Sequence, residues 1–551
     1  MGDGARRMAV TVRPMGLRAL LAEVDSDEHV AALLADLTEH RQAGGLDAGA
    51  ELVPAARTVL VDGLADAGQV RTLARWLGGW QPHALPVGEG PLVEIPTVYD
   101  GEDLADVAAL WDVSVEEAAR LHAACEFRVA FCGFAPGFAY LTGLPERLAV
   151  PRRATPRTRV PAGSVALGGA YTGVYPGPSP GGWQLIGRTS LPLWDPSRDP
   201  AALLAPGTRV GFRPVRAGSA AAGPAPGPAV GAVGAVPAAT GQSAARAVTV
   251  VRPGPLATVQ DEGRSGVAAL GVPHAGALDR PAAARANALV GNPPGAAVVE
   301  ATLGGIALRA ETDAWVAVTG APAPVRVGGR TAAWGAAVRA RAGELVEVGT
   351  VTAGLRCYVA VDGGFAVAPV LGSRSTDLLS GLGPEPLVAG AVLPLGQVGP
   401  AVPTGNEDAL GPPCVDWLPL SAPSDRDEVV LRLAPGPRQD WFDAEALRAL
   451  ARGRYRVSPQ SNRVGLRLTD GPALVRRAGL GHGQAELPSE GMVLGAVQVP
   501  PDGMPVVFLA DHPTTGGYPV IGVVPEADLA AAAQAVPGTP VRFVPVSGPL
   551  R

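Results

Sequence analysis

The sequence GGWQLIG at residues 181–187, followed by PGTRVGFRPV at residues 206–215, has a second copy further along the chain. Residues 516–522 read GGYPVIG, and residues 537–546 read PGTPVRFVPV. In each copy we expect a short helical segment between the Gly-Gly-aromatic motif and a Val-rich final strand. The repeat predicts two related β domains, one in each half of the chain.

The composition agrees with a fold built from many short strands. The 551 residues include 73 Gly and 56 Pro, while aromatic residues make up only 5%. Such a composition indicates short elements joined by tight turns and argues against a helical bundle. Upstream of the repeat, GSVALGG from Gly163 is similar to GMVLGAV from Gly491. We therefore predict a mainly β fold with α+β parts.

The N-terminal region has a different pattern. Residues 10–98 predict strand, helix, strands, helix and strand, with helices around Val30–Leu37 and Val70–Trp80 and a buried strand at Thr58–Val61. This order is typical of a small α/β plait. Further on, Ser114-x-x-Glu117 is a capping box, which predicts a helix up to about Ala124.

A stretch of almost pure Ala, Gly, Pro, Val and Ser divides the chain. Residues 216–247 cannot bury enough apolar surface to fold, so we predict a disordered linker there. Before it we expect the plait at 1–98 and a β domain at 99–215. After it we expect two further β domains, at 248–400 and 401–551.

Several functions are excluded because all 45 basic residues are arginine. A Walker A loop, a Schiff-base enzyme and a biotin carrier each need a lysine, so no biotin is attached to this chain. The net charge of −6 makes nucleic acid an improbable partner. The four cysteines are too few for a disulfide framework. With no signal-peptide pattern and no long apolar stretch, we expect a cytoplasmic protein with no membrane partner.

Six polar loops carry the candidate site residues. They combine arginine with hydroxyl, amide or carboxylate groups and lie at residues 156–164, 259–264, 276–280, 372–377, 458–463 and 511–518. Arginine with these groups suits a small carboxylate, phosphate or lactam ligand, although each loop alone is also explained by turn capping and Arg–Asp bracing. His512, beside Asp511, is the best candidate for acid–base chemistry. The glycine-rich turn at 133–138 is predicted to pack Phe134, Phe138 and Tyr140 inward.

These motifs carry a resemblance to a known family. The first half resembles the B subunit of bacterial 5-oxoprolinase, also called allophanate hydrolase subunit 1 and related to a sporulation-kinase inhibitor. The second half resembles the C subunit of the same enzyme, the biotin-dependent carboxyltransferase-like or allophanate hydrolase subunit 2 family. The first half matches through IPTVYDGEDL from Ile95, FCGFAPGFAYLTGL from Phe131, TPRTRVPAGSVALGG from Thr155 and YPGPSPGGWQLIGRT from Tyr175. The second half matches through TVQDEGRSG from Thr258, GALDR, NALVGN, VLGSRSTDLL from Val370, YRVSPQSNRVGLRL from Tyr455 and ADHPTTGGYP from Ala510. One departure is Gly16-Leu17, where the family usually has Gly-Asp, and we predict no function for that loop.

The resemblance implies cyclophilin-like β-barrel domains in a fusion of two subunits that are usually separate. It also implies ATP-dependent opening of 5-oxo-L-proline to L-glutamate, through phosphorylation of the lactam, together with a separate A subunit of 5-oxoprolinase. ATP and Mg²⁺ are the expected cofactors, with Asp261, Asp279 or Asp377 as candidates to hold the metal. The metal ligands, the half that binds ATP, and homo-oligomer formation stay open. The candidate catalytic residues are Asp261, Asp279, Arg374, Asp377 and His512. The candidate residues for binding substrate or ATP are Arg157, Arg159, Ser164, Gln260, Arg264, Ser375, Gln460, Ser461, Arg463, Thr514 and Tyr518.

Two other functions remain as alternatives. One is the carboxyltransferase component of a urea-carboxylase-like biotin system, which would need a biotin carrier on another chain. The other is a regulator that binds a histidine kinase, because the first half is related to such an inhibitor. Amide hydrolysis by a Ser-Ser-Lys amidase centre is excluded, since the chain has no lysine.

Overall fold

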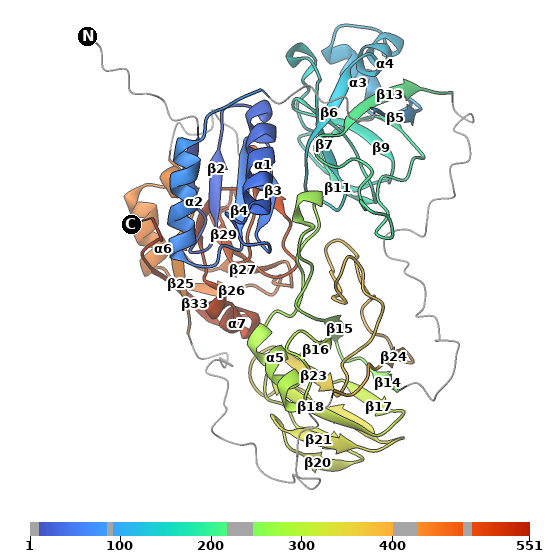
Figure 1. Ribbon diagram of the computed structural model, residues 1–551, viewed down its shortest axis with the longest axis vertical. Coiled ribbons are helices and arrows are strands. Elements are labelled where there is room, and N and C mark those ends of the chain that lie inside the picture. The colour runs from blue at the N-terminus through green and yellow to red at the C-terminus, as the bar shows by residue number, and fades with distance from the viewer. Residues whose placement is uncertain (1–9, 85–91, 217–245, 400–427, 478–486, 551) are drawn as a thin grey trace.

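The computed structural model describes residues 10–84, 92–216, 246–399, 428–477 and 487–550. The predicted linker lies almost wholly outside these ranges, as does the start of the predicted domain at 401–551. Within them, seven α-helices accompany a much larger number of short strands (Figure 1). The predicted mainly β class is confirmed. None of the helices in the described ranges has the length and apolar character needed to cross a membrane.

The N-terminal domain, here called the plait, is an antiparallel sheet with two helices on one face. Its strand order is β1–β2–β4–β3. Ser26 and Asp66 cap the two helices by accepting backbone N–H groups of the first turn. Leu33 and Leu73 from these helices pack on Val59 of the sheet. The bounds are Thr11–Pro14 (β1), Leu20–Glu23 (β2), Asp27–Gln42 (α1), Glu51–Pro54 (β3), Thr58–Asp62 (β4) and Ala67–Gly79 (α2).

The second domain contains a seven-stranded sheet with the order β12–β9–β10–β7–β6–β13–β5. Ser114 caps α4 by accepting the Glu117 N–H, as the capping box predicts. A two-stranded ribbon, β8 with β11, lies beside the main sheet. The bounds are Leu92–Thr97 (β5), Leu104–Leu110 (α3), Val115–Ala123 (α4), Glu126–Cys132 (β6), Ala139–Thr142 (β7), Arg157–Val160 (β8), Ser164–Gly168 (β9), Tyr171–Val174 (β10), Ser179–Gly181 (β11), Gln184–Arg188 (β12) and Arg209–Pro214 (β13).

The last domain is a closed barrel, here called the C-terminal barrel, with the order β25–β32–β29–β30–β27–β26–β33. Its strands match those of the second domain one for one, and in both domains the final strand runs parallel to the first. The bounds are Val429–Pro435 (β25), Ala444–Arg452 (α6), Tyr455–Val457 (β26), Gly465–Thr469 (β27), Glu490–Gly491 (β28), Ala496–Gln498 (β29), Val506–Phe508 (β30), Thr515–Gly516 (β31), Val520–Val523 (β32), Glu526–Gln534 (α7) and Pro540–Pro545 (β33).

The sequence repeat therefore corresponds to a structural repeat. The Gly-Gly-aromatic motifs lead into β12 and β32, and the Val-rich runs form β13 and β33. The short helical segment predicted in both copies is present only in the second, as α7. In the first copy the prediction is wrong, because residues 189–208 form turns that include a Trp194–Ala202 bridge.

The domain at residues 246–399, here called the sandwich, consists of two sheets around one core. One sheet has the order β20–β19–β22–β17–β14–β24 and the other β15–β16–β23–β18–β21. Val250, Val259 and Leu308 are among the residues from both sheets that share this core, while α5 packs on the second sheet through Ala283 and Ala286. The bounds are Ala247–Arg252 (β14), Leu256–Gln260 (β15), Arg280–Leu289 (α5), Val298–Thr302 (β16), Ala307–Ala310 (β17), Ala314–Gly320 (β18), Val325–Val327 (β19), Arg330–Ala332 (β20), Ala337–Ala340 (β21), Leu345–Val348 (β22), Arg356–Val361 (β23) and Val392–Pro394 (β24).

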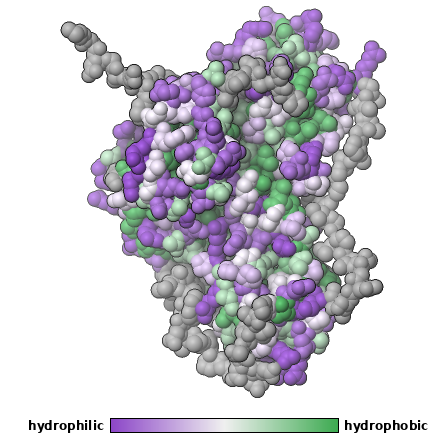
Figure 2. All heavy atoms as spheres, viewed as in Figure 1, coloured by the Kyte–Doolittle hydropathy of each residue, from purple (hydrophilic) through white to green (hydrophobic). Residues whose placement is uncertain are grey.

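The plait packs on the C-terminal barrel, so the two halves of the chain share a core. Leu21 and Leu60 on the free face of the plait sheet form one apolar cluster with Met492 and Val520 of the barrel. A Cβ on Gly491 would lie 2.5 Å from the Leu60 Cβ, so the backbone approaches the sheet closely. Figure 2 shows mainly hydrophilic residues over the plait's helices, on the opposite side from this contact.

The turn at residues 133–138 joins the second domain to the second half of the chain. Phe138 is buried as predicted, but Phe134 is 40% exposed, so its predicted inward packing is wrong. The reason is that Phe134 has a left-handed backbone, with φ of 67°, and its N–H donates to Thr515 Oγ1. The Gly137 N–H donates to the Leu270 carbonyl. The turn therefore docks domains together.

Replacing Leu60 tests the plait–barrel contact. Leu60 is fully buried, and Leu60→Ala removes apolar contacts and leaves a cavity. We expect a loss of about 2–5 kcal/mol in the free energy of unfolding, measured as a lower urea midpoint. Leu110→Ala is the control, because Leu110 is 56% exposed on α3. Equal midpoints for the two variants would contradict the shared core.

Candidate functional site

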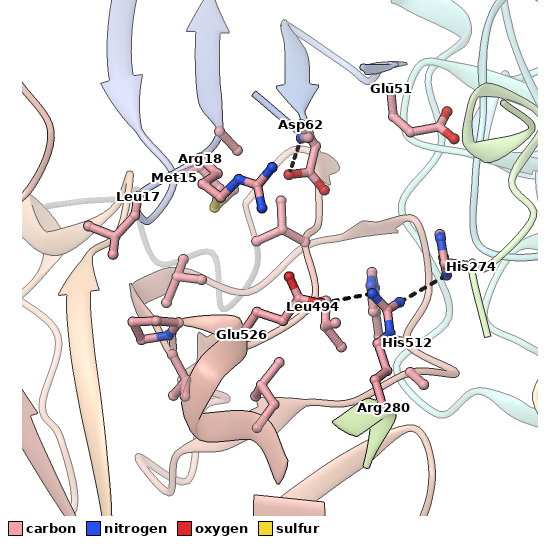
Figure 3. Close-up of a pocket in the computed structure, with 18 of the residues that line it drawn as sticks. Met15, Leu17, Arg18, Glu51, Asp62, His274, Arg280, Leu494, His512 and Glu526 are labelled. Atoms are coloured by element: carbon pink, nitrogen blue, oxygen red, sulfur yellow. Dashed lines mark hydrogen bonds and ion pairs between the residues drawn. The ribbon is translucent and has the colours of Figure 1, made fainter. Parts of the chain in front are cut away.

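The plait, the sandwich and the C-terminal barrel meet around a cleft (Figure 3). A cavity of about 300 Å³ lies there, and two adjoining cavities of about 600 and 430 Å³ share Arg280 and Glu526 in their walls. This size suits a small ligand. The charged and titratable residues that line the first cavity come from all three domains: Arg18, Glu51 and Asp62, then His274 and Arg280, then His512 and Glu526.

The plait contributes two neighbouring carboxylates. Glu51 and Asp62 are directly paired across β3 and β4, so their side chains lie on the same face of the sheet. Burial, with a smaller effect of the Glu51 charge, raises the pKa of Asp62 to about 6, while Arg18 acts in the opposite direction. Burial also raises the pKa of Glu51. Each carboxylate of this wall therefore keeps its proton to a higher pH than a free carboxylate does.

Arg18 is held by the turn between β1 and β2. Its Nε donates to the Leu64 carbonyl at 2.7 Å, and Figure 3 shows its guanidinium near Asp62. Gly16 has φ of 77°, and its N–H donates to the Pro435 carbonyl of the barrel. Leu17 lines the cavity as well. The loop for which no function is predicted from the sequence thus forms part of the cleft wall.

Two histidines on the other side of the cleft are neutral. His512 Nδ1 lies 2.8 Å from the Pro513 carbonyl, which can only accept, so Nδ1 carries the proton and Nε2 has a free lone pair. Burial lowers the pKa of His512 to about 4. Burial and the Arg280 charge lower the pKa of His274. Both rings are therefore available as proton acceptors.

Arg280 is the first residue of α5, where the Asp279 carboxylate caps the helix. Its Nη1 donates to Glu526 at 2.9 Å, and its Nη2 lies 3.3 Å from His274 Nδ1. The Arg280 and Glu526 side chains are 35% and 55% exposed. Ion pairs this exposed contribute only about 0–1 kcal/mol.

A buried charge network joins the sandwich to the C-terminal barrel. Arg463 of the barrel donates to Glu300 of β16 at 2.5 Å, to both oxygens of Asp511 at 2.8 and 3.0 Å, and to the Gly276 carbonyl at 2.7 Å. Burial opposes the charge of Glu300, but Arg463 and Arg356 lower its pKa. Burial and the Asp511 charge raise the pKa of Asp377 to about 6.

The loops at 259–264 and 372–377 come together around Asp261. Its carboxylate accepts the hydroxyls of Ser373 and Ser375 at 2.5 Å and the Arg374 N–H at 2.6 Å. Arg264 donates to the carbonyls of Val370 and Ser375, and no partner is present for its buried Nη1 within the described residues. This cluster is a brace between two loops.

The remaining sequence-predicted residues lie in several places. His512 lines the first cavity, and Gln260 and Asp261 line the cavity of about 430 Å³. In the second domain, Arg157 pairs with Asp103, at 2.8 Å, and with Glu102. The predicted residues that line none of the three cavities are Arg157, Arg159, Ser164, Arg264, Asp279, Arg374, Ser375, Asp377, Gln460, Ser461, Arg463, Thr514 and Tyr518.

The three aspartates suggested for Mg²⁺ do not fit a metal site as placed here. Asp261 accepts four hydrogen bonds, Asp279 accepts from the Ala282 N–H and the Gln534 amide, and Asp377 accepts from Leu379 and Ser380. In the part of the chain that the structure describes, no group of three or more His, Cys, Asp or Glu side chains could hold a metal ion.

Five residues of the cleft were missed in the sequence analysis: Arg18, Glu51, Asp62, His274 and Glu526. Arg280 lies in the predicted polar loop at 276–280, although it was not among the named candidate residues. The five missed residues lie in segments without polar motifs, and only the packing of the plait, the sandwich and the barrel brings them together.

The buried network can be tested through Arg463. Arg463→Gln leaves the buried carboxylates of Glu300 and Asp511 without their main partner. We expect a loss of about 3–5 kcal/mol in the free energy of unfolding, measured by urea denaturation. Arg159→Gln, on an exposed position of β8, is the control and should change the midpoint little.

Asp62 should affect stability in a pH-dependent way. Its pKa is raised in the folded protein, so its ionisation destabilises the fold as pH rises from about 4 to about 6. Asp62→Asn cannot ionise. We therefore expect the Tm of the variant minus that of the wild type to increase over this range and to level off above it. A difference that stays constant, or that falls with pH, would contradict the raised pKa.

Comparison with known proteins identifies the family. Residues 270–545 match the family described as carboxyltransferase domain, subdomain A and B, and residues 10–204 match carboxyltransferase domain, subdomain C and D. The chain is 38% identical over 301 residues to the 5-oxoprolinase C subunit of Escherichia coli strain K12, covering 54% of this chain and 91% of that protein. It is 51% identical over 152 residues to the 5-oxoprolinase B subunit of Escherichia coli O157:H7, covering 27% of this chain and 68% of that protein.

Other matches cover one half or the whole chain. Urea amidolyase of Lachancea kluyveri is 32% identical over 316 residues, which cover 55% of this chain and 17% of that protein. The crystal structure of TTHA0988 superposes with a TM-score of 0.79 at 34% identity, covering 96% of this chain and all of that one. This protein therefore belongs to the carboxyltransferase-domain family, as a single chain whose two halves are similar to the B and C subunits of 5-oxoprolinase.

Proposed function

We propose that this chain provides the B and C components of an ATP-dependent 5-oxoprolinase. Together with a separate A component, it would open 5-oxo-L-proline to L-glutamate. The observation that carries the proposal is the composition of the cleft. Its walls come from the half similar to the B component and from the half similar to the C component, so one site needs both.

The reaction requires activation of a stable cyclic amide. Transfer of the γ-phosphoryl group of ATP to the lactam oxygen makes the ring carbon electrophilic. Water can then attack this carbon, and the ring C–N bond breaks to leave γ-glutamyl phosphate, which a second water hydrolyses to L-glutamate and inorganic phosphate. His512 Nε2 is suited to accept a proton from the first water, because the imidazole ring is neutral and its tautomer is fixed by Pro513. Asp62, with its raised pKa, is suited to donate a proton to the leaving nitrogen. ATP and Mg²⁺ belong to the assembled enzyme in this proposal and are assigned to no residue of this chain.

Carboxyl transfer in a urea-carboxylase-like biotin system is a second candidate. It is favoured by the carboxyltransferase family and by the similarity to urea amidolyase. The chain contains no lysine that could carry biotin, so a biotinylated partner would be required.

Release of glutamate from 5-oxo-L-proline with Mg-ATP tests the proposal. The full chain would be assayed alone, with the co-expressed A component, and with the A component but without ATP. We expect glutamate and ADP in equal amounts only when both proteins and ATP are present. His512→Gln should lower kcat at least tenfold, while the distant Arg309→Gln should leave it unchanged.

Absence of glutamate from a folded complex with the A component would refute the proposal. Transfer of a carboxyl group from a biotinylated carrier to urea by the same preparation would then support the second candidate. Glutamate release by the A component alone would also overturn the assignment of this chain to the reaction.

A further inference from the structure

Arg280 occupies a distinctive position in the cleft. With Glu526, it lines all three adjoining cavities, so this ion pair lies where the three spaces meet. The Asp279 cap fixes the start of α5 and therefore the backbone of Arg280, while its side chain reaches toward the barrel (Figure 3).

Two other arginines near the cleft, Arg463 and Arg264, are themselves buried. Arg463 is held by Glu300, Asp511 and the Gly276 carbonyl, and its side chain is only 2% exposed. Arg264 is also buried, and it bonds to backbone carbonyls. A ligand could reach either one only by breaking a buried network, and an unpaired buried charge is strongly unfavourable.

Arg280 differs because its carboxylate partner is exposed. Glu526 is more than half exposed, so water can solvate it fully once the pair separates. A carboxylate that entered the cleft could therefore replace Glu526 at little cost. Its bidentate pairing with the guanidinium would be stronger than the single contact between Arg280 Nη1 and Glu526 that it replaces.

The surroundings of Arg280 also favour an anion. Arg18 lies on the opposite wall and uses one N–H for the Leu64 carbonyl. Burial raises the pKa of both Glu51 and Asp62, and below about pH 6 the Asp62 carboxyl is protonated and no longer repels an anion. His274 and His512 offer neutral acceptors for an amide N–H or a water.

We propose that Arg280 binds the carboxylate of the substrate in exchange for Glu526, and that the cleft takes a small cyclic amide bearing one carboxylate. Glu526 holds the guanidinium in place until the ligand arrives. The inference rests on the proposed function for the identity of the ligand, 5-oxo-L-proline, and it adds the residue that recognises the ligand's charge.

Calorimetric titration of the full chain with 5-oxo-L-proline, without ATP or the A component, tests this. We expect Arg280→Gln to weaken binding at least tenfold, and Glu526→Gln to bind as tightly as wild type or more tightly. Arg309→Gln is the control, because Arg309 forms a comparably exposed ion pair with Glu311 in the same domain. The uncharged lactam 2-pyrrolidinone should bind more weakly, and its affinity should be the same for wild type and Arg280→Gln.

Each contrary result overturns the inference. The first contrary result is that Arg280→Gln binds 5-oxo-L-proline with the wild-type affinity. The second is that Glu526→Gln loses as much affinity as Arg280→Gln does. The third is that the wild-type chain does not bind 5-oxo-L-proline. Unchanged melting temperatures would show that the variants are folded. The glutamate assay separates this inference from the proposed function. If the Arg280→Gln variant releases glutamate with the wild-type KM, only the role of Arg280 is refuted. If the wild-type complex releases no glutamate, the proposed function is refuted.

Discussion

The guanidinium of Arg463 fixes how the two domains of the second half lie against each other. It comes from the C-terminal barrel and binds Asp511 of the same domain, Glu300 of the sandwich and the Gly276 carbonyl. Buried charges are tolerated only when their partners are in place, so a shift between the domains would leave carboxylates unpaired in the interior. The cleft depends on this constraint, because Arg280 approaches from the sandwich and His512 from the barrel.

The third wall of the cleft is held by a different kind of contact. The plait sheet places its apolar face on the barrel through Leu60 and its neighbours. Apolar packing has little directional preference, and here polar contacts add direction. Arg438 of the barrel pairs with Glu23 of the plait and with Glu490. The result is a site composed of both halves, and a single chain guarantees that the halves are present in equal amounts.

More of the fold than of the candidate site could be predicted from the sequence. The repeat gave the correct equivalence of β12 and β13 with β32 and β33, because strand patterns and turn glycines are local properties. The roles of the arginines could not be predicted, because they depend on distant partners. Arg463 meets Glu300 across 163 positions in sequence, and Arg280 meets Glu526 across 246. An arginine in a hydroxyl-rich loop looks the same in sequence whether it braces two domains or is available to a ligand.

Burial also decides the charge of the cleft. By sequence alone, the three carboxylates of the cleft, Glu51, Asp62 and Glu526, outnumber its two arginines, Arg18 and Arg280. The neighbouring histidines could be neutral or positively charged. In the structure, burial raises the pKa of the two plait carboxylates and lowers those of His274 and His512. Placing Glu51 beside Asp62 is unfavourable for folding, and such local conflicts are typical of functional positions. Protonation of Asp62 below about pH 6 removes negative charge from the wall facing Arg280, so a cleft that is acidic by composition accepts an anionic ligand more readily as the pH falls.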